Sequence, residues 1–282
     1  MGIDRVEGPG AEATPSVVQG IEPMGRAAGQ NTPAIDRTAL SEFLDTLLEP
    51  RRFSDYCPNG LQAEGKPRIA RVVCGVTASL ALVKAAAQSG ADALLVHHGW
   101  FWRGEDPRVI GTRRERLATL LAHDINLYAY HLPLDVHPDV GNNVELARRL
   151  GWPLGESFGR DGLIRMAHLE QPTEVGSLAR LLQDRLGQPP LAVGDLNRPI
   201  RRLAWCTGAA QDCLQDAIDA GADAFVSGEI SERTTHLARE AGVVYLAAGH
   251  HATERFGVQA LGQRVADAFG IEVRFIDDPN PV

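Results

Sequence analysis

Lysine is nearly missing from this chain of 282 residues, which limits the partners that it can bind through charge. Lys66 and Lys84 are the only lysines, so arginine carries almost all of the positive charge, and the formal net charge is −8. A nucleic-acid-binding protein held by a broad basic face is therefore not expected. A local arginine lining stays open, with these candidates: Arg103, Arg108, Arg113 and Arg114.

Long apolar runs are also missing. No run is long enough to cross the hydrocarbon core of a bilayer, and the first residues lack the apolar core of a signal peptide. The four cysteines form no C-x-x-C pair; they are Cys57, Cys74, Cys206 and Cys213. This usage is typical of reduced thiols, so we expect a cytoplasmic protein without a membrane segment.

Several motifs of common enzymes are absent: the P-loop, the dinucleotide fingerprint, the nucleophile elbow and H-E-x-x-H. Residues 1–35 are rich in Gly, Pro, Ala and Glu without periodicity, which predicts a flexible N-terminal extension. Apolar residues on one helical face between Leu40 and Leu48 predict the first helix, capped by Asp36 or Thr38 and ended by Pro50.

An internal repeat organises residues 36–282. Gly-Ala-Asp-Ala at 90–93 recurs at 221–224, and the apolar strands that begin at Arg71 and Arg202 are separated by the same number of residues. Each copy is predicted as strand, helix, strand, a crossover that should be right-handed. The sequence therefore predicts an α/β fold in which two related βαβ-containing lobes, about 36–150 and 151–282, form one two-lobed unit with a site between them.

Histidines beside carboxylates follow three predicted strands. They are His97 and His98, then His131 with Asp135, and last His250 with Glu254. The carboxyl ends of strands in an open α/β sheet are where ligands usually bind. Imidazole and carboxylate together are ligands for zinc, iron, manganese and nickel, so the sequence predicts a metal site, with two ions per chain.

The residues allow each role to be assigned. His97 and His98 are adjacent and can serve neighbouring metals where Gly99 lets the chain turn. Glu254 lies four residues after His250, on the same helical face, and can bridge two metals through its two oxygens. Asp135 completes the expected ligands, His97, His98, Asp135, His250 and Glu254. His131 and Glu229 are the candidate catalytic acid–base groups; outer contacts to a ligand, or for Glu229 a place beside a helix cap at Ser231, are the alternatives.

Other polar and aromatic residues have simpler interpretations. Trp100, Phe101 and Trp102 could form a wall for a planar substrate, but packing under the site or at a subunit contact is the favoured hypothesis. Asn142 and Asn143 are interpreted as capping the helix of residues 144–150. The turn at 55–62 could bring polar groups to the cleft. The remaining histidines are expected to point away from the site or to be structural or exposed: His251, His123, His168 and His236.

Five segments in this order carry a family resemblance: 55–62, 97–99, 131–135, 141–143 and 249–254. Together they resemble the Nif-three-like dinuclear-metal family, also described as GTP cyclohydrolase I type 2 homologues. The resemblance implies a toroidal homohexamer, a trimer of dimers, with metal sites facing an inner cavity. It implies as ligands the five residues assigned above. The short span of residues 150–201 indicates the compact form without an inserted domain.

Two functions follow as hypotheses. The first is a metal-dependent hydrolase in which a bridging water attacks a nucleotide, phosphoester or amide, GTP ring opening being one example. His131 or Glu229 would then move protons. The second is a non-catalytic ring that stores, senses or delivers metal, or that binds partner proteins. The polar side chains of His131, His137 and Glu229 beyond the ligands favour the enzyme.

Overall fold

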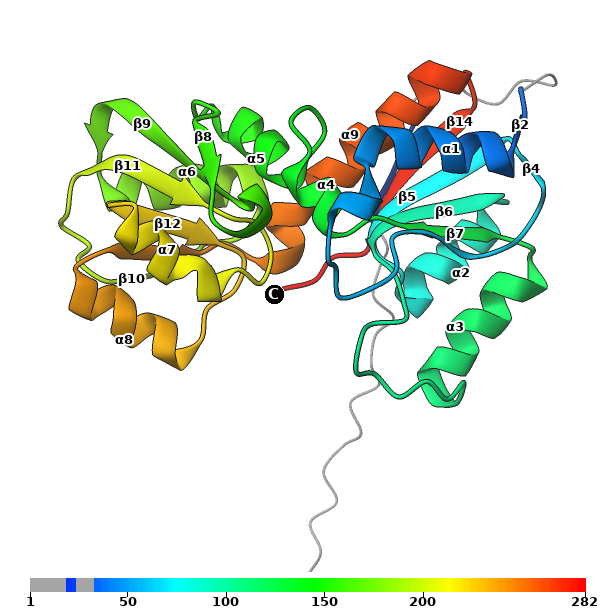
Figure 1. Cartoon of the computed structure of the whole chain (residues 1–282), viewed down its shortest axis with the longest axis horizontal. Helices are drawn as coiled ribbons and strands as arrows, with labels where there is room; N and C mark the ends of the chain where they lie inside the picture. The colour runs from blue at the N-terminus through cyan, green and yellow to red at the C-terminus, as the bar shows by residue number, and fades with distance from the viewer. Residues whose placement is uncertain (1–18, 24–32) are drawn as a thin grey trace, which may run out of the picture.

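The computed structural model describes residues 19–23 and 33–282, the first of these ranges by its backbone alone. Within them the chain forms two large sheets covered by helices, and Figure 1 shows the two lobes side by side. The α/β fold class predicted from the sequence is confirmed. No helix of these residues combines the length and the apolar character needed to cross a membrane.

The first sheet contains, among the described residues, six strands in the order β1-β14-β5-β6-β7-β3. They are Gln19–Pro23 (β1), Glu272–Asp277 (β14), Arg71–Thr77 (β5), Ala93–His98 (β6), Asn126–Ala129 (β7) and Gly60–Ala63 (β3). The four central strands are parallel, and β1 and β3 close the edges in antiparallel pairing. The carboxyl ends of β5, β6 and β7 therefore lie at the same end of the sheet.

The second sheet repeats this arrangement in the order β10-β13-β12-β11-β9-β8. Its strands are Leu191–Val193 (β10), Val244–Ala247 (β13), Ala224–Ser227 (β12), Ile200–Trp205 (β11), Ile164–Thr173 (β9) and Glu156–Phe158 (β8). Its three parallel strands, β11, β12 and β13, correspond to β5, β6 and β7 of the first sheet. Ile35–Asp36 (β2) and Arg68–Ile69 (β4) form a separate small pair.

Helices cover both faces of each sheet, which explains why the parallel strands are nearly continuous apolar runs. One face of the first sheet is covered by Arg37–Leu48 (α1) and His250–Phe269 (α9). The other face is covered by Leu80–Gln88 (α2) and Gly111–Ala122 (α3). One face of the second sheet is covered by Asn142–Leu150 (α5) and Val175–Leu186 (α6). The other face is covered by Leu214–Asp219 (α7) and Glu232–Ala241 (α8). The short helix Leu132–Val136 (α4) lies between the lobes.

The two copies of the repeat make the same contacts. The aspartate of each Gly-Ala-Asp-Ala accepts hydrogen bonds from two consecutive backbone N–H groups: Asp92 from Ala70 (2.9 Å) and Arg71 (3.0 Å), Asp223 from Arg201 (3.0 Å) and Arg202 (2.8 Å). The other carboxylate oxygen accepts from a basic side chain at 2.7 Å, Lys66 for Asp92 and Arg198 for Asp223. Matched contacts at matched positions support a duplication.

Asp92→Asn and Asp223→Asn are each expected to lower the free energy of unfolding by about 1–3 kcal/mol, because an amide cannot accept at every position that the carboxylate fills. Burial opposes ionisation, but the hydrogen bonds outweigh it and lower the pKa of both groups. Their stabilisation is therefore present above pH 3.8, the usual pKa, and is lost as the pH falls through the folded-state pKa.

Denaturant unfolding at neutral and acidic pH measures this effect. The difference in the free energy of unfolding between each variant and the wild type should shrink as the pH falls. The control is Asp184→Asn, at an exposed position of α6, which should change the free energy of unfolding by less than about 0.5 kcal/mol. Wild-type stability in both buried-site variants at neutral pH would contradict the expectation.

Two expected boundaries need correction. Most of the predicted flexible extension, residues 1–18 and 24–32, lies outside the described residues, but its segment Gln19–Pro23 is a strand paired with β14. The boundary between the two lobes also differs from the expected one at residue 150. β14, expected in the second lobe, belongs to the first sheet, and α5, expected in the first lobe, packs in the core of the second. The reason is that α9 spans both cores and returns the chain to β5.

Candidate metal centre

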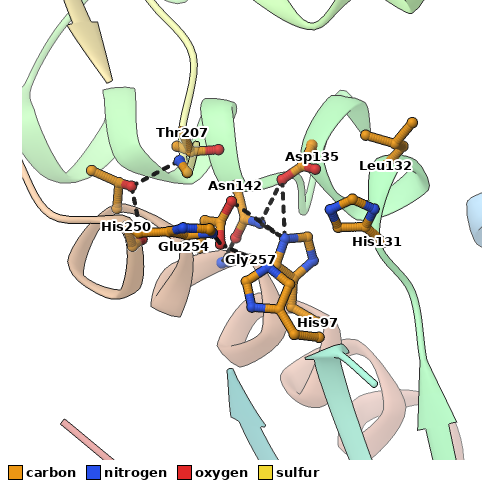
Figure 2. A network of polar contacts seen from close by, with 12 residues as sticks. His97, His131, Leu132, Asp135, Asn142, Thr207, His250, Glu254 and Gly257 are labelled. Atoms are coloured by element: carbon orange, nitrogen blue, oxygen red, sulfur yellow. Dashed lines mark hydrogen bonds and ion pairs between the residues drawn. The ribbon is translucent and has the colours of Figure 1, made fainter. Parts of the chain in front are cut away.

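The polar side chains predicted to converge meet between the two sheets (Figure 2). They come from the end of β6, from α4 just after β7, and from the first turn of α9 just after β13. β7 and β13 are corresponding strands of the repeat, so the two lobes face each other through the same ends of their sheets. The members are His97, His98, His131, Asp135, His250 and Glu254.

The Glu254 carboxylate lies at the middle of the group and is buried. Its Oε1 lies 3.5 Å from His97 Nε2, and its Oε2 lies 3.2 Å from His98 Nε2 and 2.9 Å from His250 Nε2. Asp135 Oδ1 lies 3.4 Å from His97 Nε2. One oxygen of Glu254 thus faces each half of the group, as a bridging ligand requires.

Four groups of donor atoms among the described residues could hold a metal ion; two contain His131, and the other two share Glu254. His98, His250 and Glu254 form one, and His97, Asp135 and Glu254 form the other, with the donor atoms of each set within 4.8 Å of one another. Glu254 Oε2 is buried and has no hydrogen bond. A buried carboxylate oxygen whose nearest neighbours are imidazole nitrogens fits a cation, because buried negative charge is costly unless positive charge balances it.

Each of these imidazoles is held by an outer contact to its Nδ1. The contacts are His97 to the Tyr130 carbonyl (2.9 Å), His98 to Thr77 Oγ1 (3.0 Å) and His250 to Glu229 Oε1 (2.7 Å). Such contacts select the tautomer and orient the ring, which leaves every Nε2 pointing at the centre.

The electrostatics of the group favour protons on His97 and His250 but not on His98, because burial, together with the charge of His97, lowers the pKa of His98 to about 4. Burial alone would lower the pKa of His97, but the charges of Asp135 and Glu254 outweigh it and raise the pKa to about 9. His250 is affected in the same way by Glu254 and Glu229, also to a pKa of about 9. Protonated imidazoles thus balance the buried carboxylates, which is the role that metal ions would fill.

His131 lies at the edge of the group and is oriented by Asp55. Its Nδ1 lies 2.7 Å from Asp55 Oδ1, and Asp55 Oδ2 accepts hydrogen bonds from Leu132 N and Asn59 Nδ2, both at 2.9 Å. Burial would raise the pKa of Asp55, but these contacts, first that with His131, lower it to about 2. Asp55 is therefore a fixed anion. The turn at 55–62 was expected only to bring polar groups to the cleft.

Glu229, predicted as an acid–base group, lies on the outer side of His250. Its carboxylate contacts His250 Nδ1, and its carbonyl accepts a hydrogen bond from Tyr245 at 2.5 Å. Glu229 does not line the cavity over the centre. The geometry matches the alternative in which Glu229 supports a ligand.

Asn142 was interpreted as a helix cap, and the structure gives it another position. It is the fully buried first residue of α5, and its Nδ2 donates to Asp135 Oδ1 at 2.8 Å. Its Oδ1 accepts from the backbone N–H of Gly257 at 3.0 Å (Figure 2). Asn142 therefore ties α9 to Asp135. An amide a few residues after a candidate ligand was the only signal in the sequence.

A cavity of about 610 Å³ opens over the centre. Of the aromatic run, Trp102 lines this cavity, whereas Trp100 is buried in the core and donates to the Ala78 carbonyl at 2.9 Å. Packing under the site is thus confirmed for Trp100, whereas Trp102 faces the cavity, and the alternative of a subunit contact stays a prediction. The remaining histidines lie as expected: His251 turns to Asp277 (2.8 Å), and His123, His168 and His236 are exposed.

Comparison with known proteins identifies the family. The model of the family Duf34/NIF3 (NGG1p interacting factor 3) matches residues 35–281. The chain belongs to the DUF34/NIF3 family. A Pseudomonas aeruginosa relative named GTP cyclohydrolase 1 type 2 homolog is 54% identical over 252 residues, which cover 88% of this chain and 99% of the relative. An Escherichia coli K12 relative of the same name is 48% identical over 86% of this chain and 98% of its own length.

Solved structures of the family share the fold. The structure described as protein ybgI, of unknown function, is 47% identical, with a TM-score of 0.83, and covers 88% of this chain and 100% of its own. A protein of Thermus thermophilus is 36% identical, with a TM-score of 0.77 and the same coverage. The family resemblance inferred from the five sequence segments is thereby confirmed.

Proposed function

We propose that this chain binds two divalent metal ions and acts as a hydrolase. The observation that carries the proposal is Glu254, whose two oxygens reach two separate sets of imidazole and carboxylate donors. A pair of bound divalent ions would lower the pKa of a water molecule and stabilise negative charge that develops on the substrate.

The side chains divide between the two ions. His98 and His250 would hold one, His97 and Asp135 the other, and Glu254 both. Zinc, iron, manganese and nickel all accept this donor set, and supply in the cell decides among them.

His131 is the proposed proton carrier. Asp55 holds its Nδ1, so its Nε2 is free to face the cavity, within reach of the ligands. Glu229 keeps His250 oriented and can take up a proton from its Nδ1. Relatives carry the name GTP cyclohydrolase 1 type 2 homolog, which agrees with hydrolysis of a C–N bond; phosphoester cleavage would use the same groups.

Elemental analysis of the purified protein tests the proposal. About two metal ions per chain are expected in the wild type. The double variant His97→Ala/His250→Ala should contain none, because it removes one imidazole from each set. A wild type that neither contains metal nor takes it up would contradict the hydrolase and favour a scaffold or partner-binding ring. Two retained metals without turnover of any substrate would favour storage, sensing or delivery.

The quaternary structure and location belong to the same proposal. By family resemblance we propose a homohexamer, a trimer of dimers, in the cytoplasm, where its four free cysteines would stay reduced. Light scattering should give a mass six times 30.4 kDa. A monomeric or dimeric mass at micromolar concentration would contradict the ring.

A further inference from the structure

The cavity over the metal centre has a composition that selects among substrates. We propose that it takes a small, uncharged, planar ring compound, a heteroaromatic or a cyclic amide, and excludes nucleoside triphosphates. The proposal rests on the hydrolase function above and names its substrate class.

The wall that faces the centre is largely apolar. It brings together aromatic and aliphatic side chains from both lobes: Tyr56, Trp102, Leu132, Leu163, Ala209 and Ala210. A volume of about 610 Å³ is in the range of small-molecule sites. Such a wall favours an organic ring over a hydrated chain of phosphates, because burying unpaired charge is costly.

The lining of the cavity combines carboxylates with the imidazoles of the centre. Among the described residues that line it, none is lysine or arginine, whereas Asp135, Asp212 and Glu254 are carboxylates. Asp212 is paired with Arg233, so Asp135 and Glu254 would offset only half of the charge of two divalent ions. Apart from the metal ions, a triphosphate would meet none of the arginine or lysine side chains that phosphate recognition normally uses.

The arginines near the cavity are already bound to other groups. Arg160 donates to Tyr56 Oη (3.3 Å) and to the Ser54 carbonyl (3.2 Å), and Arg103 donates to the Asp55 carbonyl (2.7 Å). Beyond Trp102, a second hollow contains arginines, but two of them pair with carboxylates of the same loop, Arg108 with Asp106 and Arg113 with Glu105. Arg103, Arg160 and Arg116 of the second hollow keep their charge, but none of the three lines the cavity over the centre.

Trp102 gives the cavity a flat side. Its ring centroid lies 5.0 Å from that of His131 and 6.0 Å from that of His98. Tyr56 also lies near His131, with ring centroids 6.4 Å apart. A ring placed against Trp102 would present its C=O or C=N group to His131 and the metal ligands, where hydrolysis is proposed.

Guanosine and GTP test the proposal because they share a ring and differ in charge. Binding to the metal-loaded full-length protein would be measured at constant ionic strength by tryptophan fluorescence and by calorimetry, with metal content checked afterwards. Guanosine should bind at least about tenfold more tightly than GTP, since only GTP brings charge that the cavity cannot pair. Equal or tighter binding of GTP, or binding of neither at about millimolar concentration, would overturn the proposal.

Substitutions locate the interaction. Trp102→Ala should weaken guanosine binding about tenfold while leaving the metal content unchanged, because stacking on the indole is lost. Phe101→Ala is the matched control, since Phe101 is the adjacent aromatic residue, is exposed and does not line the cavity. Equal losses in both variants, or no loss in Trp102→Ala, would overturn the placement of the ring.

The same assay on metal-stripped protein separates this proposal from the hydrolase proposal. If elemental analysis finds no metal, the hydrolase fails, but the preference for guanosine and its dependence on Trp102 should persist, because they arise from the wall. If metal is present and GTP is preferred, the substrate class fails and the metal centre stands.

Discussion

Glu254→Ala is expected to release both metal ions, whereas Asp135→Ala should release only one. Glu254 is the residue shared by both sets of donors, and Asp135 belongs to one of them. Loss of a contact that only orients a ligand already costs about 10–100-fold in affinity, so loss of a shared ligand should exceed about 100-fold at each position. Titration of metal-free protein with zinc, followed by calorimetry, measures both sites.

The control for Glu254 is Glu232→Ala, which removes a highly exposed glutamate of α8 and should bind metal like the wild type. Circular dichroism should show that all three variants are folded. Two metals at full occupancy in Glu254→Ala would remove the bridging assignment. Loss of both from Asp135→Ala would show that the two positions fill only together.

Gly208→Ala is expected to abolish metal binding without changing any donor. A Cβ at Gly208 would lie 1.9 Å from Glu254 Oε1 and 3.2 Å from His250 Nε2. The backbone cannot easily retreat, because Gly208 N donates to Thr253 Oγ1 (3.1 Å) and its carbonyl accepts from Gly228 N (2.8 Å). The carboxylate must therefore move out of its position between the imidazoles.

A second glycine separates this clash from backbone strain. Gly151 has φ 69°, nearly the same as the 70° of Gly208, but a Cβ there meets nothing within 4 Å. Gly151→Ala should cost about 1–2 kcal/mol of stability and leave metal binding intact, whereas Gly208→Ala should lose both metals. Metal analysis with thermal unfolding distinguishes the two. Normal metal content in Gly208→Ala would show that Glu254 has room to shift.

Local patterns were enough to predict several features. The strand before His250 is a short apolar run followed by polar residues, and this change of composition marks the strand end and the site together. The expectation that His97 and His98 follow their strand was wrong, because β6 continues through both. The equal spacing of Asp92 and Asp223 from their strands predicted two related halves. The structure adds the reason, since both aspartates bind the same backbone groups of the neighbouring strand.

Contacts between distant segments were not predictable in this way. Asn142 before a helix has the properties of a cap, and only the packing of α5 on α9 places it between Asp135 and Gly257. Trp100 and Trp102 are neighbours of the same type, yet one is core and the other lines the cavity. Their directions depend on the loop geometry after β6, which the sequence pattern does not encode.

The sequence by itself determined the donor residues, their positions at strand ends and the repeat, because these depend on residue type and spacing along one segment. The tertiary structure alone decided that Glu254 lies between the two donor sets, that Asp55 and Glu229 hold His131 and His250, and that β14 completes the first sheet. Each of these depends on how α9 crosses between the two cores. That crossing is set by the joint burial of many apolar side chains, and no single motif records it.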